Sequence, residues 1–178
     1  MKDNYEYYRL AENILNNEYF LQLKKDNHHG TNKYDHCRRV SYVSFKLAKL
    51  FKADCKQTVR AGLLHDFFYG ERTDKEENSY LNHPNTSAIN AKKYFGISDK
   101  EAEDIRTHMF HHVLVKKIFP FVNHKEKAKI KDVKPKSKEG AIICLSDLLV
   151  SIYEFEKYRF QYGISLTFLF VLNLLTIQ

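Results

Sequence analysis

The segment AGLLHDFF, residues 61–68, decides the fold of this chain, because it places two ionisable residues inside an apolar run. Apolar residues spaced three or four apart predict a helix over about 55–68, whose inward side carries Val59, Gly62, Leu63 and Asp66. Burying the Asp66 carboxylate is costly unless a partner compensates for its lost hydration. The segment therefore predicts a polar site inside a helical core.

The helix that precedes this segment also carries an ionisable residue on its inward side. It is predicted to begin near Thr31, and residues three or four apart form its inward stripe: His36, Val40, Val43, Leu47 and Leu50. His36 is therefore expected to point toward the same core as Asp66.

Two further helices are predicted on either side of these. One spans about residues 4–23, where apolar positions again recur three or four apart. The other begins at His83-Pro84 and ends at Gly96, because proline is tolerated in the first helical turn. The polar stretch 69–82 lacks a helical period and is expected to be a loop.

The C-terminal part of the chain is also expected to be helical. Ser98 and Glu101 form a capping box, which predicts a helix start. The face of this helix is expected to carry Ile105, His108 and His112. A long helix over about 138–160 should present Ile143, Asp147 and Val150 on one stripe.

The fold class predicted from these patterns is all-α. The 178 residues suit one domain, and 43% hydrophobic residues with only 6 Gly and 3 Pro favour a globular helical chain. We expect a single-domain bundle of about six to eight helices over residues 1–178, with its core at 31–154. No stretch alternates with period two for long, so strands are not expected.

The cysteines and the N-terminus favour a cytoplasmic location. Cys37, Cys55 and Cys144 are odd in number and widely spaced, which predicts neither disulfides nor a thiolate zinc site. The first residues carry acids where an export signal would need basic residues followed by an apolar run.

The basic charge of the chain is concentrated in one segment. Residues 116–138 hold nine lysines against Glu126 and Asp132, which accounts for the whole net charge of +7. The segment is interpreted either as a solvated loop or as a surface that attracts an anionic substrate. With only Phe119 and Phe121 as aromatics and no binding motif, it predicts no specific nucleic-acid partner.

The C-terminal run 164–177 is strongly apolar but polar at three positions. It is shorter than the roughly 18–20 residues that span a bilayer. We expect a helix that is buried or forms a homodimer, and membrane contact is the alternative.

The ionisable residues on the inward helix faces predict a metal site. Four of them are His36, Asp66, His108 and Asp147, and His65 lies beside Asp66. Desolvating several such groups in one core is unfavourable, whereas a divalent ion satisfies all of them together. Taken singly, each has another interpretation, such as a hydrogen-bonded core histidine or a capping aspartate.

The order of these residues resembles the H…HD…D signature of the HD superfamily of metal-dependent phosphohydrolases. The resemblance runs from about Thr31 to Glu154 and includes the form H-x-x-R-V at residues 36–40. It implies a helical bundle of the HD-domain type and one ion held by His36, His65, Asp66 and Asp147. Members with two ions add histidines, for which His83 and His108 are the candidates. Iron, manganese, nickel or zinc would suit these ligands.

The resemblance also implies the reaction and suggests further site residues. A metal-activated water would hydrolyse a phosphoester or phosphoanhydride bond in a small, anionic, nucleotide-like substrate. Asp66 would bridge the ions, and Glu71 and Asp74 would orient the water. Candidate substrate contacts are Lys33, Arg39, Arg72, His111, His112 and Lys116. The alternatives are a non-catalytic HD module that senses nucleotides and an interaction protein that uses the lysine-rich segment.

Overall fold

The computed structural model of the chain describes residues 2–28, 31–70, 82–118 and 133–176. These residues are mainly helical, which confirms the predicted all-α fold class. The α-helices are α1 (Lys2–Leu15), α2 (Glu18–Leu21), α3 (Lys33–Phe51), α4 (Cys55–Leu64), α5 (His83–Phe95), α6 (Asp99–Arg106), α7 (Phe110–Ile118) and α9 (Lys138–Thr176). The short 3₁₀ helix η1 (Gln22–Lys25) follows α2.

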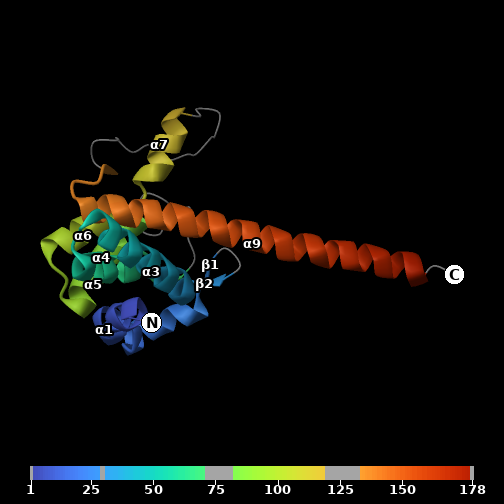
Figure 1. The fold of residues 1–178 in the computed structure, drawn as a ribbon, viewed down its shortest axis with the longest axis horizontal. Coiled ribbons are helices and arrows are strands. Elements are labelled where there is room, and N and C mark those ends of the chain that lie inside the picture. The colour runs from blue at the N-terminus through green and yellow to red at the C-terminus, as the bar shows by residue number, and fades with distance from the viewer. Residues whose placement is uncertain (1, 29–30, 71–81, 119–132, 177–178) are drawn as a thin grey trace.

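The centre of the molecule is the crossing of α3 and α4 (Figure 1). Gly62 of α4 lies so close to α3 that a Cβ atom there would be 3.0 Å from the Cα atom of Ser41. The Ser41 hydroxyl also donates a hydrogen bond to the Val59 carbonyl, at 2.9 Å. This close contact brings His36, at the start of α3, toward His65, at the end of α4.

A methyl group at Gly62 should therefore destabilise the protein. We expect Gly62→Ala to lower the free energy of unfolding by about 1–3 kcal/mol, because overpacking forces the helix backbones apart. Gly163→Ala is the matched control, since Gly163 also lies in a helix and a Cβ there meets nothing within 4 Å. That control should be neutral or slightly stabilising, by up to about 1 kcal/mol. Urea denaturation measures both values, and equal effects would contradict the prediction.

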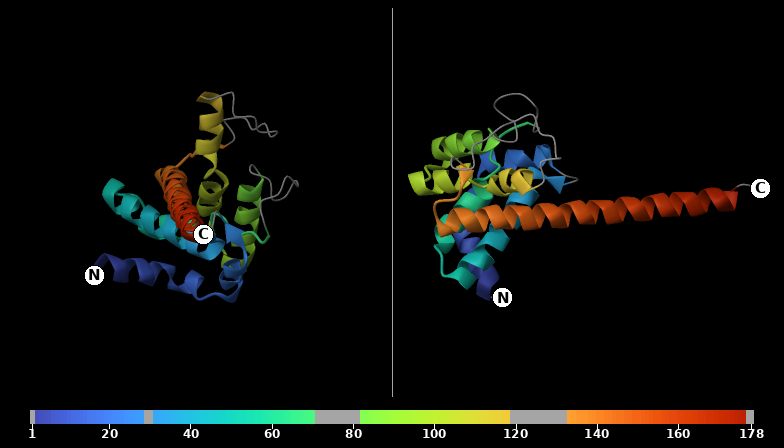
Figure 2. Two further views of the ribbon diagram at one scale, coloured as in Figure 1. Left: turned by 90° about the vertical axis from the view of Figure 1, so that its right-hand side faces the viewer. Right: turned by 90° about the horizontal axis from the view of Figure 1, so that it is seen from above.

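The long helix α9 crosses the bundle and then leaves it. It packs against α3, α4 and α6, and its C-terminal part extends past the other helices (Figures 1 and 2). The prediction of one helix over 138–160 and a separate one over 164–177 is wrong, because α9 continues without a break through Gly163. The side chains of 164–177 lie outside the described residues, so their burial stays a prediction. None of the helices in the described ranges has the length and apolar composition needed to cross a membrane.

The N-terminal part of the chain differs from its prediction in two ways. The helix expected over 4–23 breaks after Leu15, where the Asn17 side chain accepts a hydrogen bond from the Tyr19 amide and caps α2. Two short strands, β1 (Asn27–His28) and β2 (Thr31–Asn32), then pair antiparallel just before α3. Strands were not expected, and two residues are too few to show a period of two.

Two other predicted helices end earlier than expected. The one predicted over 55–68 ends at Leu64, although Phe67 and Phe68 are fully buried. The helix that begins after Ser98 stops at Arg106, so His108 and His112 do not share one helix face with Ile105 as predicted. In contrast, the capping box is present, and Gly96 ends α5 in a left-handed conformation.

The predicted inward stripe of α3 is partly wrong. Leu50 is 70% exposed, and Val43 and Leu47 are only half-buried. The buried side of α3 instead carries His36, Cys37, Val40, Ser41, Ser44, Phe45 and Ala48. Of these residues, Ser41 lies against Gly62 of α4, where the two helices approach closely.

Candidate metal centre

Six predicted ligands meet in the core, and most of them come from helix ends. His36 lies in the first turn of α3, and His65 and Asp66 directly follow the last residue of α4. His83 begins α5, His108 lies between α6 and α7, and Asp147 lies within α9. All six are almost completely buried, with none above 3% exposed. Short helix ends thus bring side chains from distant parts of the sequence to one place.

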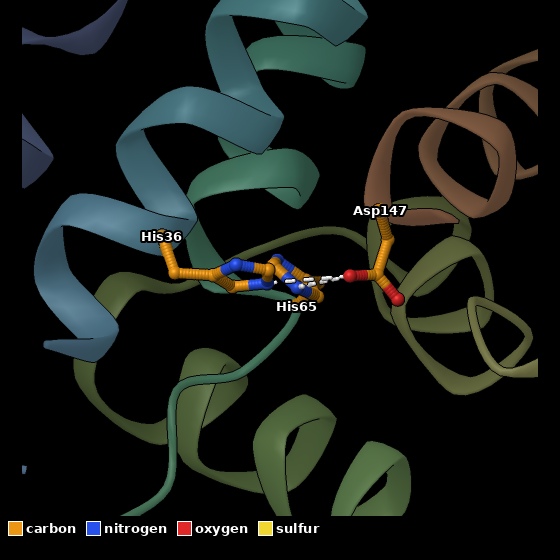
Figure 3. A group of neighbouring side chains, drawn as sticks. All are labelled: His36, His65 and Asp147. Carbon is orange, nitrogen blue, oxygen red and sulfur yellow. Dashed lines mark ion pairs between the residues drawn. The ribbon is translucent and has the colours of Figure 1, made fainter. Parts of the chain in front are cut away.

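One group of ligands is formed by His36, His65 and Asp147. The Asp147 Oδ1 atom is 3.2 Å from His36 Nε2 and 3.7 Å from His65 Nε2 (Figure 3). Figure 3 shows both imidazole rings directed at this carboxylate from α3 and from the end of α4. The three donor atoms lie within 4.8 Å of one another, which is close enough to hold a single ion.

A second group of donor atoms within 4.8 Å of one another is formed by His65, Asp66 and His108, and His83 lies beside it. The Asp66 Oδ1 atom is 3.2 Å from His83 Nε2 and 3.7 Å from His108 Nε2. The two imidazole nitrogens are themselves 3.1 Å apart. The other carboxylate oxygen of Asp66, Oδ2, is 3.9 Å from His65 Nε2. One oxygen of Asp66 therefore faces His65, and the other faces His83 and His108.

The histidines are oriented by hydrogen bonds on their far sides. His65 Nδ1 donates to the Gly62 carbonyl at 2.9 Å, and His108 Nδ1 donates to the Ile105 carbonyl at 2.7 Å. Because a carbonyl only accepts, the hydrogen must lie on Nδ1, and in the neutral ring this leaves the Nε2 lone pair directed into the cluster. This arrangement is typical of metal-binding histidines.

Burial and the neighbouring charges shift the pKa values of the cluster residues in opposite directions. Burial opposes charge on His36 and His65, but hydrogen bonds with Asp147 and Glu154 raise the pKa of His36, and Asp66 holds the pKa of His65 well above its usual value. Burial would raise the pKa of Asp147, but His36 and His65 hold it well below its usual value. Burial and the neighbouring His65 lower the pKa of His108.

The donor set fits a divalent transition metal. Imidazole nitrogens with carboxylate oxygens and no thiolate suit iron, manganese, nickel or zinc. Bonds from such ions to imidazole nitrogen are about 2.0–2.1 Å long, so nitrogens 3.1 Å apart are within reach of one ion. Burial of two carboxylates among four imidazoles is also the situation that a cation relieves best.

Metal binding to this cluster should release protons. Burial opposes charge on His65, but Asp66 holds its pKa well above the usual value, so any proton on Nε2 must leave before this nitrogen can bind an ion. Affinity should therefore rise with pH until the pH exceeds that pKa. Titration calorimetry with Mn²⁺ at pH 7 is carried out in two buffers of different ionisation enthalpy. The difference between the two binding heats should correspond to the release of roughly one proton or more per ion. Equal heats in the two buffers would contradict this expectation.

Two predicted substrate contacts have other partners. Lys33 is fully buried, and its ammonium donates hydrogen bonds to Asp26 and to the carbonyls of Phe68 and Gly70. Arg39 lies behind His36 and bonds to Glu154. Lys33 thus holds the chain that follows the HD dyad, which is the pair His65 and Asp66. The positions of Lys33 and Arg39 do not support direct contact of either residue with a phosphate.

The other predicted contacts lie beside the cluster or beyond the described residues. His111 and His112 are half-buried in the first turn of α7, and neither belongs to the candidate metal groups found among the described residues. His111 Nδ1 donates to the His108 carbonyl at 3.1 Å. Lys116 lies in α7 without a described side chain, and three predicted residues fall outside the described ranges: Glu71, Arg72 and Asp74.

One residue of the site was missed by the sequence analysis. Glu154 lies on α9 two turns after Asp147, and its carboxylate is 2.9 Å from His36 Nδ1. An acid seven residues from Asp147 shares its helix face, which is the signal that could have found it.

The comparison with protein families agrees with this geometry. A family model described as the HD domain matches residues 34–151, well over half of the chain. This segment contains all six clustered residues. No match was found among curated proteins or among solved structures. The chain therefore belongs to the HD domain family, a family of metal-dependent phosphohydrolases.

Proposed function

We propose that this protein hydrolyses a phosphoester or phosphoanhydride bond in a small, anionic, nucleotide-like substrate, using one or two divalent transition metals. The observation that supports this most strongly is the buried cluster itself. Four imidazole Nε2 atoms converge on the carboxylates of Asp66 and Asp147, within a chain of the HD domain family.

Within this proposal the six residues divide into two sets. His36, His65, Asp66 and Asp147 hold the first ion, and His83 and His108 hold a second ion together with Asp66. The two oxygens of Asp66 face different histidines, which suits a bridging carboxylate. When bound, such ions polarise a phosphate oxygen and lower the pKa of water.

The residues of the chain prepare the site for this chemistry. Hydrogen bonds from Nδ1 of His65 and His108 fix the direction of their rings before any ion arrives, so little reorganisation is needed. The Phe68 ring is fully buried and packs against the His83 ring, with 5.4 Å between the ring centroids. Candidate groups for orienting the water or the substrate remain Glu71, Asp74, Arg72 and Lys116.

Two measurements on the purified protein test the proposal. The protein is reconstituted with Mn²⁺ or Fe²⁺, and its metal content is determined by inductively coupled plasma analysis. Phosphate or nucleotide release is then followed over a panel of nucleoside monophosphates, cyclic nucleotides and dinucleoside polyphosphates. We expect at least one ion per chain and metal-dependent hydrolysis of some panel members. Absence of bound metal would overturn the proposal, and bound metal without hydrolysis would favour the nucleotide-sensing module.

A further inference from the structure

Glu154 connects the candidate metal centre to the outer side of α3. Its side chain is buried, at 5% exposure, although it comes from α9. One carboxylate oxygen, Oε2, is 2.9 Å from His36 Nδ1, and the other, Oε1, is 2.6 Å from Arg39 Nη1. The residue lies beyond the segment that matches the HD domain model, which ends at residue 151.

We propose that Glu154 is a positioning residue of the metal centre, which holds His36 in the tautomer that directs its Nε2 lone pair at the ion. The inference rests on the proposed metal centre. It assigns Glu154 no contact with the substrate or with the ion, because His36 lies between them. Its action is confined to the first set of ligands, since it touches neither His83 nor His108.

The chemistry of the three groups explains why a carboxylate is needed. An ionised carboxylate only accepts hydrogen bonds, so both of its neighbours must donate. Arg39 is always a donor, and His36 must then carry its hydrogen on Nδ1. The other ring nitrogen of His36, Nε2, faces the cluster, because it is 3.2 Å from Asp147 Oδ1. Histidines that bind metals commonly donate to a carboxylate in this way.

Replacement of Glu154 by glutamine should reverse this tautomer. Glutamine has one accepting oxygen and one donating nitrogen. Arg39 requires the oxygen, so the amide nitrogen must face His36 and donate to Nδ1. The hydrogen of the neutral His36 ring is then favoured on Nε2, and it must be moved at a cost in free energy before Nε2 can bind an ion. The change from Glu154 to glutamine preserves the shape of that side chain but weakens His36 Nε2 as a ligand.

The first experiment compares metal affinities of full-length proteins. Dissociation constants for Mn²⁺ are measured by competition with a chelator for the wild type, for Glu154→Gln and for Glu156→Gln. Glu156 is the matched control, because it lies on the same helix, is 60% exposed and pairs only weakly with Arg159 at 3.2 Å. We expect Glu154→Gln to weaken the ion at His36 about 10–100-fold, as loss of such a partner commonly does. The control should match the wild type.

A double variant separates positioning from a merely structural role. In Glu154→Gln combined with Arg39→Met, the amide oxygen is free to turn toward His36 and to accept from Nδ1. We therefore expect the double variant to regain most of the lost Mn²⁺ affinity. If Glu154 only stabilised the fold, loss of Arg39 would add to the damage. Circular dichroism monitors folding in parallel.

The outcomes distinguish this inference from the proposed function. A wild-type protein that binds no Mn²⁺ would overturn both. If the wild type binds Mn²⁺ and Glu154→Gln binds it equally well, the inference fails while the metal centre stands. A double variant that binds no more tightly than Glu154→Gln would also overturn the inference.

Discussion

Replacement of Asp66 by alanine should abolish metal retention and hydrolysis while leaving the helix content largely intact. Asp66 is fully buried and is the one carboxylate among the described residues that faces both groups of histidines. Its removal takes a ligand from each proposed ion at once. Because bound ions supply several kcal/mol of transition-state stabilisation, we expect turnover to fall on the order of 10³-fold or more.

Metal analysis, a phosphate-release assay and circular dichroism measure the three parts of this expectation. Asp99→Ala is the control, because the Asp99 side chain is 92% exposed and pairs with Lys92 far from the cluster. That variant should keep the metal content and turnover of the wild type. Retained hydrolysis in Asp66→Ala would remove Asp66 from the ligand set.

The helix faces could be predicted from apolar spacing only where large residues mark them. His36 was placed on the buried side of α3, as the structure shows, but Leu50 was placed there as well and is exposed. The buried side of α3 also carries Ser41 and Ser44, which have almost no hydrophobic signal. Ser41 is buried where Gly62 allows a close helix crossing, and a local sequence pattern does not show such a contact between distant segments.

Helix ends were predicted well where the cap is local and poorly where it is not. Ser98 and Glu101 are three residues apart, and their reciprocal hydrogen bonds follow from the sequence alone. The early end of α4 allows Asp66 to leave the helix and face His83. Phe67 and Phe68 are buried although they follow the end of the helix, and a periodic pattern does not distinguish such residues from a continued helix.

The candidate site could be predicted because its residues follow in a recognisable order. The residues that contact the site from behind, such as Glu154 and Lys33, could not be predicted from the sequence. Glu154 reaches His36 across 118 residues of sequence, and Lys33 reaches the Phe68 carbonyl across 35. Both carry a charge that, in sequence, looks equally suited to solvent or to substrate. Only the fold shows that Glu154 contacts a predicted ligand and that Lys33 binds the chain that follows His65 and Asp66.

The number of ions is tested by the histidines of the second group. We expect His83→Ala and His108→Ala each to lower the Mn²⁺ content from two ions toward one and to reduce turnover strongly. Both Nε2 atoms face Asp66 Oδ1, at 3.2 Å and 3.7 Å, and neither residue belongs to the group formed by His36, His65 and Asp147. Loss of either should therefore leave the first ion bound.

The contrasting variant is His36→Ala, which should weaken the first ion instead. His111→Ala is the control for metal content, because His111 belongs to neither candidate ligand group among the described residues and its ring hydrogen-bonds to the backbone carbonyl of His108. Metal content is measured by inductively coupled plasma analysis, and the ions are located by anomalous scattering from Mn²⁺-soaked crystals. In a two-ion site both ions stabilise an in-line displacement, so loss of the second ion should lower turnover while the first ion stays bound.

A single ion in the wild type, with His83 and His108 not bound to it, would contradict this account. It would favour a one-ion mechanism in which Glu71 or Asp74 orients the water.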